Sequence, residues 1–419
     1  MLRGGMMRPS YENRLLLILS LSFGFVFFDR LALSFLFPFV SNELNLTNAD
    51  LGMLSSALSL TWAISGATLG AWSDKRASRK PVLIAAVIAF SVLSSLSGLV
   101  TGFLSLLLFR ALMGIAEGPV LPVSQSLLAD ASTPARRGLN MGIVNGSAPG
   151  LLGAVIGPPV LVWLATTHGW RTAFLLSIAP GIIIALLIAC YVKESRSKGR
   201  GDSINIAHDR RSLSNWAALL KNRNIALCVV IACFYLTWFV TIVSFAPTFL
   251  VQFHHFSART MSYVMSMLGF AWVGWGFVVP AISDRIGRKP AMVIFSLIAA
   301  VCPILMIYVT DAATMAPLVL ATYTGLGCFT LFMATIPAES TNPRTIATAL
   351  GLIMGVGELV GGFLSPTIAG FAADHYGMPV VMWIASAGAL VPALLSCFLR
   401  ETAPARISAG SARQMASID

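Results

Sequence analysis

Charged residues interrupt two apolar stretches of this sequence. The segment "FVFFDRLALSF" places Asp29 directly before Arg30, and "LFRALMGIAEGPVLP" places Arg110 seven residues before Glu117. A charged side chain at the centre of a bilayer costs about 3 kcal/mol or more on insertion scales, and acids in such positions usually belong to proton relays or ion pathways. These residues therefore indicate proton or ion movement. A static ion-pair network that only holds the helices together is the alternative.

The spacing of these residues predicts how they are arranged. On a helix, positions i and i+7 lie on the same face, so Arg110 and Glu117 share one face. Neighbouring residues point about 100° apart, so Asp29 and Arg30 cannot both serve one role. We expect Asp29 to face a partner on the helix of Glu117, and Arg30 to face a cavity.

The composition assigns the chain to the polytopic membrane proteins. Of its 419 residues, 57% are hydrophobic and 11% are charged, whereas soluble domains carry about 25% charged residues. Apolar stretches of about 20 residues, enough to cross a bilayer as a helix, recur along the chain. We expect an all-α fold with these twelve spans: 14–41, 51–73, 81–101, 103–131, 139–166, 170–193, 224–252, 259–283, 290–311, 314–339, 345–373 and 377–400.

The longest polar interval divides the spans into six and six. It predicts a six-helix half over 1–193, a cytoplasmic middle loop over 194–223 with a short amphipathic helix near 216–220, a second half over 224–400 and a cytoplasmic tail over 401–419. The sequence "SDKRASRKP" after the second span returns as "SDRIGRKP" after the eighth. Paired halves of this kind are a transporter architecture with a substrate site at mid-depth.

The basic residues predict the orientation in the membrane. If the N-terminus is cytoplasmic, 24 of the 28 Lys and Arg residues fall on the cytoplasmic side, as the positive-inside rule requires. We therefore expect both termini in the cytoplasm and the chain in the inner (plasma) membrane. The net charge of +11 is explained by this topology, so no nucleic-acid surface is predicted.

Other function classes lack their sequence signals. No HExxH, GxSxG or GxxxxGK(S/T) motif occurs, so we do not expect an enzyme. The six cysteines all fall in apolar segments without a CxxC pair and are interpreted as small apolar residues, with no disulfide, metal or cofactor site. We expect a monomer that contacts membrane lipids.

The repeated loop motif resembles the signature of the major facilitator superfamily, G-x-x-x-D-(R/K)-x-G-x-(R/K)-(R/K). Ala77 replaces the usual glycine in the first copy. The resemblance implies a gating role, in which a carboxylate at a helix end forms a contact that breaks as the halves move. Simple positive-inside anchoring is the alternative. The candidate gating residues are Asp74, Lys75, Arg79, Asp284, Arg285 and Arg288.

A narrower resemblance comes from the first and fourth spans. The Asp-Arg pair, with Arg110, Gly114, Glu117 and Pro122 in the pattern R-x-x-x-G-x-x-E-(G/A)-x-x-x-P, is similar to the anion:cation symporter family. It implies proton-coupled symport of a small organic anion by alternating access. The arginines would bind the carboxylate and the acids would carry the proton. Spinster-like lysolipid or amphiphile exporters share much of the pattern and are the alternative.

Two further residues complete the predicted site. Tyr235 in the seventh span is a candidate substrate contact, as an aromatic residue able to line the cavity. Glu358 lies in the middle of the eleventh span, where the resemblance implies a neutral polar residue. It is a third candidate for proton coupling, a partner for a cationic group, or a carboxyl group kept neutral.

Overall fold

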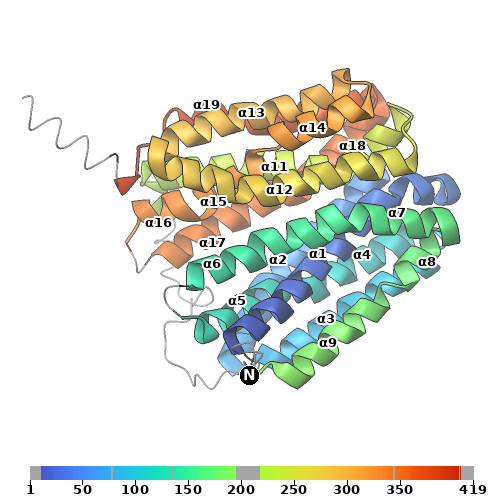
Figure 1. Cartoon of the computed structure of the whole chain (residues 1–419), viewed down its shortest axis with the longest axis horizontal. Coiled ribbons are helices and arrows are strands. Elements are labelled where there is room, and N and C mark those ends of the chain that lie inside the picture. The colour runs from blue at the N-terminus through green and yellow to red at the C-terminus, as the bar shows by residue number, and fades with distance from the viewer. Residues whose placement is uncertain are drawn as a thin grey trace, which may run out of the picture.

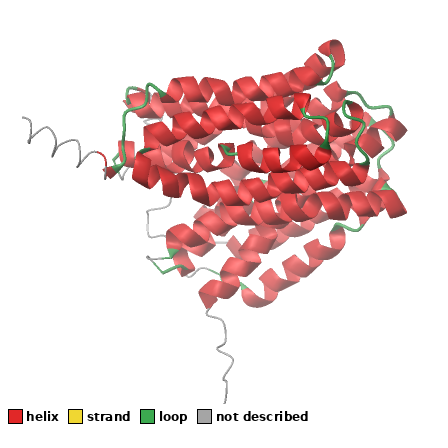
Figure 2. Cartoon of the chain, turned by 45° about the horizontal axis from the view of Figure 1, so that its top comes forward, coloured by secondary structure: helices red, strands yellow, loops and turns green. Residues whose placement is uncertain are grey.

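Helices form the whole regular structure of the described chain. The computed structural model describes residues 11–76, 79–133, 136–194, 218–342, 345–404 and 406, and it contains helices and no strands in these ranges (Figure 2). The reason is that backbone polar groups in a bilayer have no water to bond, and a helix satisfies them within one segment. The predicted all-α fold is confirmed.

In the first half, several spans consist of two or more consecutive helical segments. The bounds are α1 (Tyr11–Leu44), α2 (Asn48–Arg76), α3 (Arg79–Leu96) with η1 (Ser97–Leu99), α4 (Phe103–Glu117) with α5 (Val120–Ala131), α6 (Arg137–Gly142) with η2 (Ile143–Ser147), η3 (Pro149–Ile156) and α7 (Gly157–His168), and α8 (Trp170–Leu175) with α9 (Ile178–Tyr191).

The second half follows the same plan. Its elements are α11 (Arg223–Gln252), α12 (Ala258–Ile286), α13 (Arg288–Tyr308), α14 (Ala312–Thr322) with α15 (Gly325–Thr330), η4 (Leu331–Thr335) and α16 (Ile336–Ser340), α17 (Ile346–Gly357) with η5 (Glu358–Leu364) and α18 (Ser365–Tyr376), and α19 (Pro379–Ser396).

The described residues form twelve helical spans, as the sequence predicts. Eleven of the described helical segments are long and apolar enough to cross a membrane. The other span, α2, is less apolar because serine, threonine and glycine residues recur along it, and it packs between α4 and α18. The predicted middle loop and its short helix lie mostly outside the described residues.

The two halves repeat each other in detail. The fifth span contains the π-helical segment η3 and the eleventh contains the π-helical segment η5, at equivalent places in the two halves. Glu194, after the last span of the first half, accepts hydrogen bonds from the backbone N–H groups that begin α3. Glu401 does the same at the start of α13. A carboxylate is favourable at a helix N-terminus because of the helix dipole.

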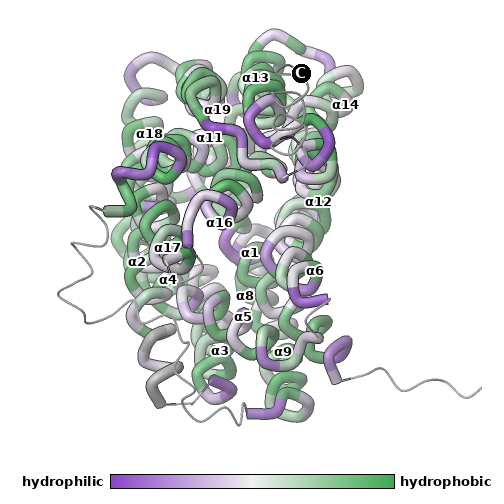
Figure 3. Tube along the Cα trace, turned by 90° about the vertical axis from the view of Figure 1, so that its left-hand side faces the viewer, coloured by the Kyte–Doolittle hydropathy of each residue, from purple (hydrophilic) through white to green (hydrophobic). Residues whose placement is uncertain are grey.

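The bundle has two distinct ends. We call the end with Tyr11, Glu194 and Glu401 the proximal end, on the left in Figure 1, and the end with the α1–α2 turn the distal end. Viewed from the proximal end, hydrophilic residues gather at the helix ends, while apolar residues line the outside of the bundle (Figure 3). This distribution suits a chain surrounded by lipid along its length and by water at its ends.

At the distal end the halves are joined by hydrogen bonds between α2 and α18. Asp374 accepts bonds from the backbone N–H groups of Asn48 and Ala49, at 3.0 and 2.8 Å, and from the Asn48 side-chain amide at 2.9 Å. Deeper in the bundle, the Ser56 hydroxyl donates to the carbonyl of Phe363. An acid of the second half thus caps a helix of the first half.

The seam between η3 and α12 is packed unevenly along its length. A Cβ atom on Gly269 would lie 2.4 Å from the carbonyl carbon of Ala154, and one on Gly150 would lie 2.8 Å from a side chain of the opposite half. Nearer the proximal end, a Cβ atom on Gly146 or Gly276 would meet nothing within 4 Å. Along this seam the halves are therefore tightly packed around Gly150 and Gly269 and less tightly packed around Gly146 and Gly276.

The cap at Asp374 makes a prediction about this conformation. We expect Asp374→Ala to shift the population toward states that are open at the distal end by about five-fold, because loss of an N-cap costs about 1 kcal/mol. Spin labels on the two halves at the distal end will show a larger share of long distances. Asp311→Ala is the matched control, since Asp311 caps α14 within one half, through the N–H and hydroxyl of Thr314. An equal shift in both variants would mean that capping across the halves does not set the conformation.

Candidate functional site

The first span presents its two charged residues to different surroundings. Asp29 is 1% exposed and lies beside Ser94 of α3, with Arg110 and Glu117 of α4 close enough for electrostatic interaction. Arg30 instead lines a central cavity and donates a hydrogen bond to the hydroxyl of Ser59 on α2, at 3.1 Å. The helix geometry thus separates an internal acid from an arginine at the cavity.

Arg30 is also held by aromatic rings. Its guanidinium carbon lies 5.2 Å from the ring centroid of Trp62 and 5.7 Å from that of Phe27. Cation–π contacts at this range stabilise the charge by about 0.5–2 kcal/mol. With one nitrogen on Ser59, the planar group is positioned by α1 and α2 together.

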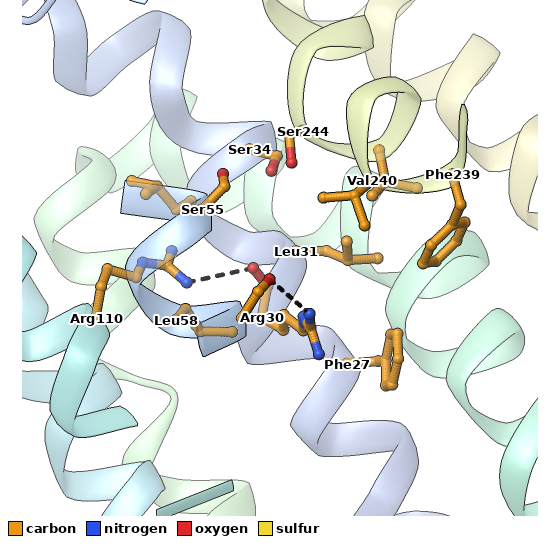
Figure 4. Close-up of a pocket in the computed structure, with 13 residues that line it drawn as sticks. Phe27, Arg30, Leu31, Ser34, Ser55, Leu58, Arg110, Phe239, Val240 and Ser244 are labelled. Atoms are coloured by element: carbon orange, nitrogen blue, oxygen red, sulfur yellow. Dashed lines mark hydrogen bonds between the residues drawn. The ribbon is translucent and has the colours of Figure 1, made fainter. Parts of the chain in front are cut away.

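Arg110 and Glu117 are buried on α4. Arg110 is 2% exposed and donates from one terminal nitrogen to the backbone carbonyl of Arg30 at 3.3 Å (Figure 4). Glu117 is fully buried and interacts electrostatically with both arginines. Close packing of α4 on α2 places them here, because a Cβ atom on Gly114 would lie 2.1 Å from the Thr61 hydroxyl oxygen.

Many polar atoms of this group have no hydrogen-bond partner among the described residues. They include both carboxyl oxygens of Glu117 and two of the three guanidinium nitrogens of Arg110. Buried polar atoms without partners are costly, and they are uncommon outside functional sites. A closed structural ion-pair network would leave few of them unpaired.

Glu358 brings a third acid to the group, from the other half of the chain. It begins the π-helical segment η5, is 8% exposed, and interacts electrostatically with Arg30. A Cβ atom on Gly362 would lie 2.2 Å from the carboxyl oxygen Oε2 of Glu358, so the glycine leaves room for the carboxyl group. π-helical segments within α-helices are frequent at functional sites.

The cavity between the halves is amphipathic. Its polar lining consists of Arg30, Arg110 and four serines, and its apolar lining comes mainly from α1 and α11. In Figure 4, Phe27, Leu31, Phe239 and Val240 lie on one side, Arg110 and Ser55 lie on the other, and Ser34 lies next to Ser244. The lining residues are Phe27, Arg30, Leu31, Leu33, Ser34, Ser55, Leu58, Ser59, Arg110, Phe239, Val240, Val243 and Ser244.

The structure places Tyr235 away from this cavity. Its side chain is fully buried in the second half, its hydroxyl is 2.5 Å from that of Ser296, and its ring stacks on Phe332 with centroids 5.1 Å apart. Packing therefore accounts for Tyr235. The aromatic lining comes instead from Phe27 and Phe239, which the sequence does not distinguish from other apolar residues of the same helices.

The four serines that line the cavity were not predicted from the sequence. Ser55 and Ser59 are four residues apart on α2 and therefore lie on one helix face. Ser34 on α1 and Ser244 on α11 come from different halves. A search for serines at helical spacing within the spans would have found the first pair.

The two loop motifs form ion pairs within their own halves. Arg79 lies 2.5 Å from Asp130, and Arg288 lies 2.5 Å from Asp284 and 3.0 Å from Glu339. Arg285 is exposed. The side chains of Asp74 and Lys75 lie outside the described part of the chain. The gating role of these residues stays a prediction.

Comparisons with known proteins agree with this fold. The profile of the Major Facilitator Superfamily matches residues 19–366. The chain is 30% identical over 362 residues, 85% of its length and 82% of the relative's, to a probable 4-methylmuconolactone transporter of Cupriavidus pinatubonensis. It is 25% identical over 375 residues, 84% and 85% of the two chains, to a hexuronate transporter of Bacillus subtilis.

Among solved structures, a bacterial homologue of the lysosomal transporter Spinster in an inward-facing, unoccupied conformation is similar, with a TM-score of 0.73 and 21% identity over 93% of this chain and 98% of that one. At this identity the likeness concerns the fold alone.

Proposed function

The chain belongs to the major facilitator superfamily and is a membrane transporter, and from that premise we propose that it carries a small organic anion together with protons, by alternating access. The observation that carries the proposal is the group of buried acids and arginines at the cavity between the halves. Arginine binds carboxylates through a planar, two-pronged set of donors. Relatives named as transporters of a lactone acid and of hexuronates support an anionic substrate.

Charge balance links the anion to the proton. Arg30 and Arg110 supply two positive charges, and Asp29, Glu117 and Glu358 supply three negative charges when all are ionised. Net charge is costly in a bundle surrounded by lipid, so one proton on the acids brings the group to neutrality. When a monovalent anion binds the arginines, neutrality requires one more proton. We therefore infer one proton carried with each monovalent anion, in the same direction.

The packing between the two halves indicates how the anion reaches the site. The distal end is closed by Asp374 and by the η3–α12 seam, and this seam is packed less tightly toward the proximal end. Since the basic residues favour cytoplasmic termini, we propose that the proximal end faces the cytoplasm and that this is an inward-facing state. Opening at the distal end and closure at the proximal end would expose the same site to the other side.

Uptake into proteoliposomes tests the proposal. One proton carried with one monovalent anion moves no net charge, so a pH gradient should drive accumulation and a potassium diffusion potential alone should not. Uptake driven by the potential and insensitive to the pH gradient would contradict proton symport. A lysolipid serves as the comparison ligand, and its transport in preference to any anion would favour amphiphile export.

A further inference from the structure

We infer that the transported anion is a compact monocarboxylate with an apolar cyclic body, and that polyhydroxylated sugar acids are poor substrates. The inference rests on the proposed anion transport and narrows it to one substrate class. It comes from the chemistry of the cavity lining, which is polar only near the two arginines and at four serines.

The polar lining suits one charged group and little else. Arg30 and Arg110 both line the cavity, and their charges are opposed by three buried acids. The positive charge left for a ligand is therefore small, which favours one carboxylate over two. No asparagine, glutamine, histidine, tyrosine or acidic residue is among the thirteen lining residues.

The wall beside Arg30, on the side away from Arg110, is apolar and firmly positioned (Figure 4). Phe27 of α1 and Phe239 of α11 both contact Trp272 of α12 edge to face, with centroids 5.6 and 5.1 Å apart. Val240 and Val243 continue this wall along α11. Such a wall matches a flat or cyclic hydrocarbon body, because aromatic rings favour stacked and edge-to-face contacts.

A sugar acid does not match this wall. It carries a hydroxyl on nearly every carbon, and each one placed against the phenyl rings and valines would lose its water without gaining a partner. An apolar pocket discriminates about 100-fold against an isostere that carries one added hydroxyl, and a sugar acid carries several. Ser34 and Ser244, which line the same cavity and are close in the view of Figure 4, offer partners for one polar substituent at most.

Binding to the purified full-length protein tests the inference. The ligands are cyclohexanecarboxylate, benzoate, 4-hydroxybenzoate, glucuronate and acetate, measured by calorimetry. We expect the cyclic apolar acids to bind at least 100-fold more tightly than glucuronate, and 4-hydroxybenzoate to bind within ten-fold of benzoate. Val243→Thr, which keeps the shape and adds a hydroxyl, should weaken cyclohexanecarboxylate several-fold and leave acetate unchanged.

The outcomes separate this inference from the proposed function. Tighter binding of glucuronate than of the cyclic acids, with uptake still driven by a pH gradient, would overturn the substrate class and leave anion symport in place. If no carboxylate in the panel binds while a lysolipid does, both fail. Equal weakening of every ligand by Val243→Thr would mean that the wall acts only through packing, and would also overturn the inference.

Discussion

Replacement of Glu117 by glutamine is expected to abolish accumulation driven by a pH gradient while exchange of the anion across the membrane continues. Glutamine has the shape of a protonated glutamate and cannot release a proton. Glu117 is buried beside both arginines and neither of its oxygens has a hydrogen-bond partner among the described residues. A gradient of one pH unit sustains about ten-fold accumulation by 1:1 symport, and the variant should show none.

Counterflow in the same proteoliposomes is the internal control for Glu117→Gln. Labelled anion entering vesicles preloaded with unlabelled anion needs no net proton movement, so it should persist and show that the variant folds and binds. Accumulation at the parental level would mean that the proton travels on another group. Asp29→Asn and Glu358→Gln, tested in the same assay, would then identify which of the other buried acids carries it.

The second large effect is expected at Arg30. Arg30→Lys keeps the charge but loses the planar group that contacts Ser59 and lies over Trp62. An ammonium group binds a carboxylate as a point charge, without paired hydrogen bonds. We expect KM for the anion to rise about ten-fold or more, equivalent to at least ~1.4 kcal/mol of binding free energy. Initial uptake rates and ligand-induced thermal stabilisation measure it.

Arg259→Lys is the matched control for Arg30→Lys. Arg259 is exposed at the start of α12 and is not among the residues that line the cavity, so its replacement should leave KM unchanged. Arg30→Ala removes the charge altogether and should bind the anion more weakly than Arg30→Lys. Parental affinity in Arg30→Ala would assign Arg30 a packing role and leave Arg110 as the anion-binding residue.

Local sequence determines the spans and the charged group of this protein. Length and hydropathy predict the twelve helices, because a bilayer imposes the same requirement on each segment separately. The spacing of Arg110 and Glu117 places them on one helix face, and the adjacency of Asp29 and Arg30 makes them diverge. The repeated motif after the second and eighth spans indicates two related halves. Each of these features can be read from single segments of the chain, without knowing how the helices pack.

Tertiary structure decides which residues meet across the halves. Asp374 caps a helix that begins 326 residues earlier in the chain, and Glu358 lies beside Arg30 although the two belong to different halves. The periodicity of one helix does not reveal such a pair, because the same pattern of apolar and polar residues suits any helix that packs against it. The contacts that close the distal end likewise depend on how two separate halves pack.

The apolar wall of the cavity is also a product of tertiary structure. The sequence predicts Tyr235 as a cavity residue, whereas the folded chain packs Tyr235 in the core and turns Phe239, one helical turn further on, toward the cavity. In a soluble protein, apolar residues point inward and polar residues point to water. In a membrane, lipid is as apolar as the protein core, so hydropathy alone cannot separate a residue that faces lipid, core or cavity, and only the packing of the helices does.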